Sequence, residues 1–286
     1  MKAKRSLFVF LATVLLTSLA CSFGIPSISQ LETGPVETLS LNEPRSNEDV
    51  LDLTFDMAFG EFNLTNGAKA LLDGEIRYNV AAWEPTVVRK DGSLTISQDA
   101  GDYTRQGFPG EDVVNAWEFR LGSVPMNLTV SAGAYDATMD LSGLPIRRFT
   151  VQDGAGEVEI RFDELNPELM DRLSYQTGAS EIAFIGLANA NFEEMNFDGG
   201  AGEYTFDFSG DLQRDAAVNI DVGLSTVRII VPPGVAAKVD IDGGPGQVSA
   251  LGVWQSEGNS YVNPGDGPQL TITVNVGAGD VHLANQ

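Results

Sequence analysis

A glycine-centred phrase recurs along the second half of the chain and limits the folds open to it. The phrase has an apolar-x-apolar run, two further residues, Gly-Ala-x, an acidic or polar residue, and a second run of alternating apolar and polar residues. Its glycines are Gly133, Gly154, Gly178, Gly200, Gly223, Gly244 and Gly277. The first six lie 21–24 residues apart, and such a period indicates a stacked repeat architecture.

Apolar and polar residues alternate on both sides of each glycine. In the fourth copy, Met195 and Phe197 precede Gly200, and Tyr204 and Phe206 follow it. A period of two is typical of half-buried strands, and glycine permits a corner through positive φ or close approach of the neighbouring chain. We therefore predict an all-β fold, a β-solenoid-like stack of about seven 22-residue rungs. A hairpin meander or a propeller is the alternative.

The first residues predict export. A basic start and an apolar run over residues 7–16 indicate a signal peptide at 1–20, too short and wrongly flanked for a membrane helix. Small residues precede Cys21, the only cysteine in the sequence, so we predict a lipoprotein anchored through Cys21. An ordinary signal peptide with an incidental cysteine is the alternative.

The remaining chain divides by composition and pattern. Residues 21–48 contain three prolines and no sustained periodicity, which predicts a flexible tether. Residues 49–121 predict an N-terminal β unit that caps the stack, because an open end would expose unpaired strand edges. Residues 122–286 predict the β-repeat domain, and the longer step between its last two glycines places an inserted loop at 254–268.

The charge of the chain is strongly negative. The sequence has 17 basic and 40 acidic residues and a net charge of −23. Such a surface argues against nucleic-acid binding and against a polybasic patch for anionic lipid. It serves either solubility or the binding of divalent cations or a cationic partner.

Carboxylates recur three residues after the repeat glycines. If the rungs stack in register, these side chains lie about 4.8 Å apart in a ladder. Ca²⁺ takes six to eight oxygen ligands, so adjacent carboxylates with corner carbonyls could hold it. A solvated acidic edge is the alternative, and no other cofactor is expected. The residues of this candidate cation edge are Asp136, Glu157, Glu181 and Glu203.

No catalytic set stands out, so we expect that the protein is not an enzyme. His282 is the only histidine, and no serine has the surroundings of a nucleophile elbow. Neighbouring carboxylates could serve as acid and base on a polysaccharide, but so acidic a chain contains such pairs by chance. They are Asp163 and Glu164, Glu193 and Glu194, and Asp211.

Aromatic residues mark one further candidate site. Trp254 and Tyr261 stand in the predicted inserted loop, where they either face a ligand or pack the loop onto the last rung. An exposed pair would suit a sugar or a protein partner.

Three stretches carry a family resemblance. Residues 117–121 (WEFRL), 124–130 (VPMNLTV) and 133–144 (GAYDATMDLSGL) resemble the bacterial toast-rack family. The resemblance extends over about residues 48–286. It implies an all-β repeat head of an adhesin-like exported protein, related to the repeat domains of cell-wall antibiotic-response membrane proteins. It supplies no catalytic residues.

These observations favour a non-enzymatic, lipid-anchored protein of the cell envelope. We expect its head to bind an envelope or extracellular protein or glycan, with the N-terminal lipid in the membrane. One alternative is an envelope-stress sensor or scaffold that binds a membrane protein, as the antibiotic-response relatives suggest. Another is a carbohydrate-active β-solenoid enzyme.

Overall fold

The computed structural model describes residues 31–45, 49–99, 110, 112–244 and 246–285. The predicted signal peptide, Cys21 and residues 22–30 of the predicted tether lie outside these ranges. Within them, no helix is long and apolar enough to cross a membrane.

The described elements are strands apart from two short 3₁₀ helices, η1 (Ala81–Trp83) and η2 (Leu187–Ala190). The strands are β1 (Glu37–Glu43), β2 (Leu51–Ala68), β3 (Leu72–Tyr78), β4 (Thr86–Lys90), β5 (Ser93–Ser97), β6 (Asn115–Gly122), β7 (Met126–Asp140), β8 (Ile146–Arg161), β9 (Met170–Ile185), β10 (Phe192–Asp207), β11 (Ala216–Ile230), β12 (Ala237–Gly243), β13 (Val248–Leu251), β14 (Gln255–Glu257), β15 (Ser260–Asn263) and β16 (Leu270–Ala284). The predicted all-β stack is confirmed.

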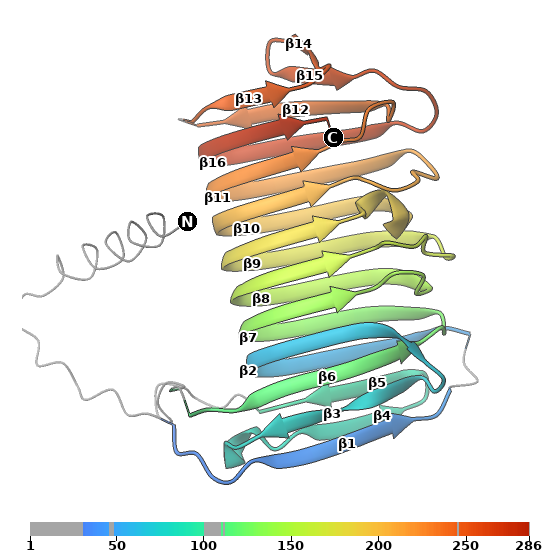
Figure 1. The fold of residues 1–286 in the computed structure, drawn as a ribbon, viewed down its shortest axis with the longest axis vertical. Helices are drawn as coiled ribbons and strands as arrows, with labels where there is room; N and C mark the ends of the chain where they lie inside the picture. The colour runs from blue at the N-terminus through green and yellow to red at the C-terminus, as the bar shows by residue number, and fades with distance from the viewer. Residues whose placement is uncertain (1–30, 46–48, 100–109, 111, 245, 286) are drawn as a thin grey trace, which may run out of the picture.

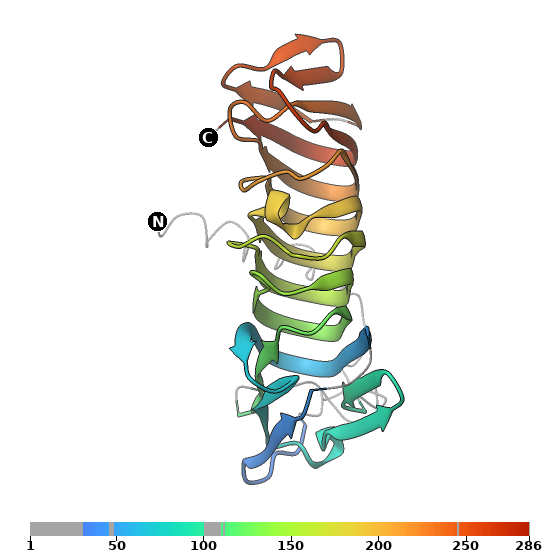
Figure 2. The same ribbon diagram turned by 90° about the vertical axis from the view of Figure 1, so that its right-hand side faces the viewer.

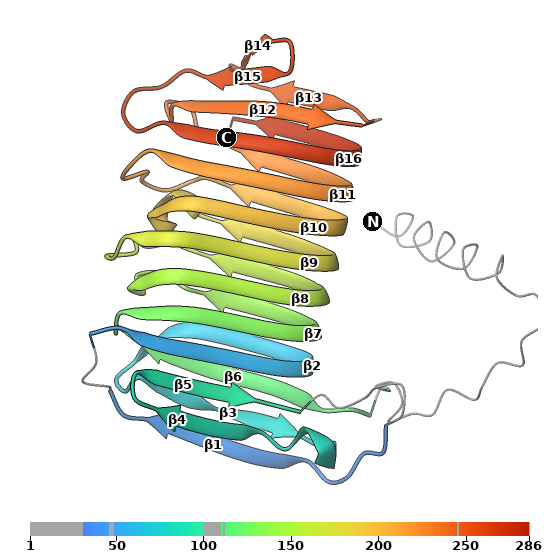
Figure 3. The same ribbon diagram turned by 180° about the vertical axis from the view of Figure 1, so that it is seen from behind.

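Long bent strands form the rungs of the stack. Strands β2, β7, β8, β9, β10, β11 and β16 follow one another side by side, each parallel to its neighbour. Each bends near its middle, so its two halves lie in two facing layers (Figures 1 and 3). The bends line one long side of the molecule, and the connecting loops line the other, which faces the viewer in Figure 2.

The core lies between the two layers. In β10, Met195 and Phe197 before the bend, and Tyr204 and Phe206 after it, are each at most 1% exposed. The rings of Phe197 and Phe206 meet edge to face with centroids 5.0 Å apart, and Phe206 stacks on Phe184 of β9 at 5.6 Å. Each buried large apolar side chain contributes about 1.5–3 kcal/mol, so the alternation on both sides of the glycine builds this core.

The bend glycines are required by close approach between rungs. A Cβ on Gly154 would lie 2.5 Å from the carbonyl oxygen of Gly133, and one on Gly178 would lie 2.5 Å from that of Gly154. On Gly200 the distance to the Gly178 oxygen would be 2.1 Å. None of these three has a positive φ. Glycine was expected at the bends either for positive φ or for close approach of the neighbouring chain. At these three positions, close approach is the reason that applies.

Shorter strands cover the N-terminal end of both layers: β5 and β6 pair with β2 in parallel, and the pairs beyond them are antiparallel. Strand β5 pairs with the first half of β2 and carries β4, while β6 pairs with the second half and carries β3 and β1. Strand β2 is itself a rung. Met57 pairs with Ala132 and Phe59 with Ala134, so Ala58 lies level with Gly133, in the column that the bend glycines form in the other rungs.

The flexible tether predicted for 21–48 is wrong over residues 37–43, which form β1. Leu41 packs into the core and Leu39 packs partly against it. Glu43 is 7% exposed and forms an ion pair with Arg89. This short alternation was overlooked because it lies beside Pro35 and Pro44.

The C-terminal end departs from sequence order. Strand β16 lies between β11 and the broken rung formed by β12 and β13. The inserted loop predicted at 254–268 contains the hairpin β14–β15, which pairs with β12 and covers that layer. Strand β16 pairs with β11 across both halves of the bend, whereas β12 and β13 are 7 and 4 residues long. The unbroken strand therefore occupies the inner position, and the broken rung lies outside it.

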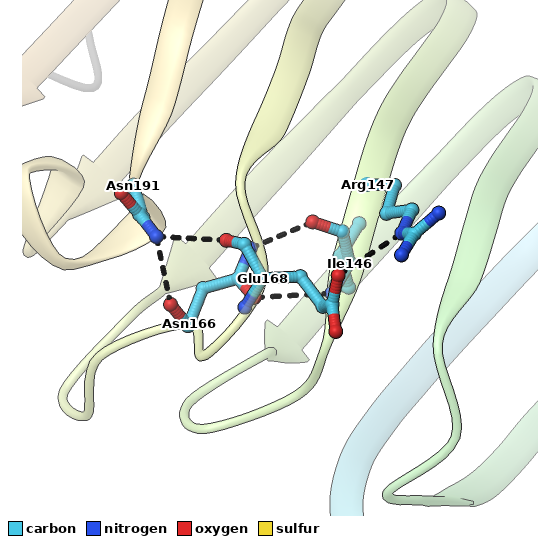
Figure 4. A network of polar contacts seen from close by, with 5 residues as sticks. All are labelled: Ile146, Arg147, Asn166, Glu168 and Asn191. Atoms are coloured by element: carbon cyan, nitrogen blue, oxygen red, sulfur yellow. Dashed lines mark hydrogen bonds and ion pairs between the residues drawn. The ribbon is translucent and has the colours of Figure 1, made fainter.

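Asparagines link adjacent rungs through hydrogen bonds on the side that the connecting loops line (Figure 4). The Nδ2 of Asn166 donates to the carbonyl oxygens of Ile146 at 2.7 Å and Ala190 at 3.1 Å. The Nδ2 of Asn191 donates to those of Asn166 at 3.1 Å and Glu168 at 2.8 Å. Both asparagines are buried, and their side-chain amides satisfy backbone carbonyls at and between the strand ends of neighbouring rungs.

Candidate binding face

Parallel register brings the predicted acidic residues into one column beside the bend. Asp136 pairs with Glu157, Glu157 with Glu181, and Glu181 with Glu203. The structure adds Glu61 of β2, which pairs with Asp136 and extends the column to five carboxylates. We call these five residues the acidic ladder. All five are exposed, and parallel strands place them about 4.8 Å apart along the backbone.

Glu61 was missed because the glycine column holds Ala58 in its rung. The nearest glycine in that rung is Gly60, two residues beyond Ala58, and an alignment on Gly60 shifts the rung by two residues. The apolar residues Phe62 and Leu64, which occupy the inward positions of the second half, are the signal that sets the alignment correctly.

Three hollows lie along the acidic ladder. One, of about 500 Å³, lies over the second halves of β2, β7, β8 and β9, and Glu61, Asp136, Glu157, Glu159 and Glu181 line it. The other two follow the bend. One measures about 640 Å³ from β8 to β16 and meets, at Gly156, a hollow of about 360 Å³ that reaches β2. We call these two adjoining hollows the corner groove.

Repulsion within the ladder acts on Glu181, which lies between Glu157 and Glu203. Partial burial raises the pKa of the Glu181 carboxyl, and the charges of Glu203 and Glu157 raise it further. No cation lies among the residues that line the three hollows in the described chain. The ladder therefore presents negative charge that its own surroundings leave uncompensated.

The geometry gives little to a metal ion. Within the described ranges, no group of three or more His, Cys, Asp or Glu side chains converges as a metal site. Ca²⁺ needs six to eight oxygens around one point, whereas the ladder spreads its carboxylates along a line. Cation binding at this edge stays a prediction.

The predicted ligand aromatics lie at the C-terminal end. Trp254 and Tyr261 are partly buried and pack against the core, and Tyr261 of β15 pairs with Val239 of β12. The indole N–H of Trp254 is buried and has no hydrogen-bond partner in the described structure. Their role in ligand binding stays a prediction.

A serine does lie beside the single histidine. The Oγ of Ser249 on β13 and the Nδ1 of His282 on β16 are 2.7 Å apart. Within the described residues no carboxylate hydrogen-bonds to His282, so the pair lacks the group that orients a catalytic histidine. Sequence spacing could not show this pair, because the register partners Ser249 and His282 are 33 residues apart in the chain.

The adjacent carboxylates weighed as acid and base do not form a matched pair. Asp163 lies 3.6 Å from Arg161, and Glu194 forms an ion pair with Arg172 at 2.8 Å. The hydrogen bond from Asn196 and the charge of Arg172 lower the pKa of Glu194. A general acid in glycoside hydrolysis needs a raised pKa instead.

Sequence reasoning missed a polar cluster inside the bend. The carboxylate of Asp153 accepts hydrogen bonds from Tyr175 Oη at 2.5 Å, Thr177 Oγ1 at 2.5 Å and Ser180 Oγ at 3.2 Å. Burial raises the pKa of Tyr175 and of Tyr135 well above the usual value, with Asp153 adding to both. Asp153 directly precedes its glycine, a position that is uncharged in the other six copies, and that exception was the available signal.

Comparison with known proteins gives a family. Residues 32–171 match the family described as the N-terminal domain of toast_rack, DUF2154. Among curated protein sequences, none matches this chain.

Three solved structures of bacterial proteins are among those to which this chain is similar. A putative cell adhesion protein from Clostridium sporogenes is 18% identical, with 88% of this chain and 100% of that chain covered and a TM-score of 0.49. A putative adhesin from Bacteroides fragilis is 11% identical over 91% and 100%, with a TM-score of 0.40. A putative adhesin from Parabacteroides merdae is 14% identical over 89% and 98%, with a TM-score of 0.35.

Proposed function

This chain is a toast-rack protein, and residues 32–171 are the N-terminal domain of that family. From this premise we propose that it is a non-enzymatic binding protein of the cell envelope. Its adhesin-like head binds a protein or glycan of the envelope or the extracellular space. The acidic ladder, held in register on five adjacent rungs, is the single observation that carries the proposal.

The scaffold supports binding more than catalysis. Parallel rungs fix the spacing of the ladder carboxylates, and the alternating core on both sides of each bend makes that spacing rigid. A rigid surface loses little conformational entropy when a partner binds. Within the described residues, the Ser249–His282 pair has no carboxylate to orient the histidine, and the pKa of Glu194 beside Arg172 is lowered rather than raised.

Anchoring by lipid at Cys21 is part of the proposal. It is supported by the signal-like sequence of residues 1–20 and by the single cysteine that follows small residues. A Cys21→Ser variant should move from the membrane fraction to the soluble fraction and lose the mass of the lipid. A membrane-bound variant of unchanged mobility would contradict lipidation.

Binding is tested with the Cys21→Ser chain, which retains the whole head. Labelled protein should bind isolated envelopes saturably, and unlabelled protein should compete for the same sites. Linear, non-competable uptake would contradict a specific binding role. Turnover of an envelope glycan that is abolished by one carboxylate substitution would instead establish an enzyme.

The same preparation separates the sensor alternative from a general adhesin. After cross-linking, a sensor or scaffold should yield one discrete membrane protein in stoichiometric amount. An adhesin should yield extracellular or cell-wall material, and its binding should survive removal of membrane proteins.

A further inference from the structure

The corner groove is an extended surface along the outside of the bend. It is lined by residues of seven successive rungs, from Phe59 and Gly60 of β2 to Gly279 and Asp280 of β16. Six steps of about 4.8 Å give it a length of about 29 Å. That length suits a linear ligand better than a compact one.

One flank of the groove is apolar. The residue after each bend glycine is usually alanine, and Ala134, Ala155, Ala179 and Ala201 line the groove in this position. Leu224 of β11 replaces the alanine and is 68% exposed. A lone exposed leucine needs no explanation, but this one enlarges the apolar flank of a groove.

The other flank is acidic. Asp136, Glu181, Glu203 and Asp280 line it, two residues beyond the apolar column. The position between the two columns holds the buried residues Ser180 in β9 and Ser225 in β11. No Lys, Arg or His lines either hollow of the groove within the described chain. The acidic flank therefore has no internal counter-charge, and a cationic occupant supplies it.

We propose that the corner groove binds an extended, cationic polypeptide segment of a partner protein. Lys or Arg side chains of the segment meet Glu181, Glu203 and Asp280, and its apolar side chains pack on Leu224 and the alanines. The inference rests on the proposed binding function and specifies the chemistry of the partner. The same charges repel nucleic acid and anionic lipid.

A model peptide tests the groove directly. The probe is a fluorescein-labelled decapeptide of alternating Lys and Leu, titrated with the Cys21→Ser chain at physiological salt while anisotropy is recorded. The double variant Glu181→Gln/Glu203→Gln should weaken binding about 5-fold, since exposed charge pairs contribute up to about 1 kcal/mol each. Leu224→Ala should weaken it about 3-fold through lost apolar contact.

A matched control has the same charge change outside the groove. Glu118→Gln/Glu193→Gln alters two exposed carboxylates on β6 and β10 that do not line it, and it should change the dissociation constant less than 2-fold. Equal weakening by the control would overturn the proposal in favour of net charge alone. Unchanged binding by both groove variants would also overturn it.

The peptide and envelope results are separable. Saturable envelope binding together with peptide binding that is insensitive to the groove variants removes the groove proposal and leaves the proposed function. Absence of saturable envelope binding removes the proposed function itself. An unchanged melting temperature of each variant shows that a loss of binding is not a loss of folding.

Discussion

At the scale of single residues, the bend glycines show how a repeat is enforced by contact with the next copy. Gly133, Gly154, Gly178 and Gly200 form a column in which each added Cβ would meet the carbonyl oxygen of the preceding rung. The constraint is a steric contact between neighbouring rungs of the same chain. It explains why this residue type recurs while the residues around it vary.

Replacing one glycine of this column should destabilise the whole stack. In Gly178→Ala the new Cβ would lie 2.5 Å from the Gly154 oxygen, and overpacking of this kind costs about 1–3 kcal/mol. Urea unfolding should show this loss. Gly34→Ala is the control, because its Cβ would meet only the Asn79 oxygen at 3.7 Å, and an equal loss there would contradict the steric account.

The tyrosines inside the bend predict sensitivity to alkali. Burial raises the pKa values of Tyr175 and Tyr135 above the unfolded value near 10. A raised folded pKa gives stability that is complete below pH 10 and is lost as pH rises toward the folded value. The free energy of unfolding should therefore fall above pH 10, and the fall should be shallower in Tyr175→Phe. Full ionisation of both phenols near pH 10 in the folded protein would contradict this.

At the scale of elements, sequence predicted the rungs well and their order at one end poorly. Alternation around Gly200 predicted the inward side chains of β10, and the common offset of Glu157, Glu181 and Glu203 predicted the ladder. The place of β16 could not be predicted, because every rung has the same local pattern and can stack on any other. Residues that occur once, such as Asp153 and Asn166, also gave no repeat signal.

The position of β16 can be tested by cross-linking. In a Cys21→Ser background, Asn219→Cys and Thr273→Cys fall on register partners of β11 and β16 and should form a disulfide readily under mild oxidation. Asn219→Cys with Asp240→Cys should not, because Asp240 pairs with Thr273 on the far side of β16. Ready cross-linking of the second pair would show instead that β12 lies next to β11, in sequence order.

At the scale of the whole molecule, the structure is a two-layer stack with different ends. Strands β5 and β6, parallel to β2, begin the cover over both layers at one end, while the β14–β15 hairpin covers one layer beyond β12. The acidic ladder and the corner groove run along the bend between these ends. A long face of this kind is the natural site for an extended partner.

Calcium should have little effect on the stability of this stack. The ladder spreads its carboxylates along a line, and no converging metal site exists among the described residues. Millimolar Ca²⁺ should therefore change the melting temperature by less than about 1 °C. A larger rise that disappears in Glu157→Gln/Glu181→Gln would establish the cation edge.

Binding through the ladder is the central claim, and one comparison tests it most directly. Envelope binding is measured for Glu157→Gln/Glu181→Gln/Glu203→Gln and for a control, Glu118→Gln/Asp171→Asn/Glu193→Gln, which removes three exposed carboxylates outside the ladder. Both variants lose the same net charge and should melt normally. The account predicts that the ladder variant loses about 10-fold or more in affinity, as three exposed pairs would give, while the control stays within 2-fold. Equal affinities for the two variants would contradict it.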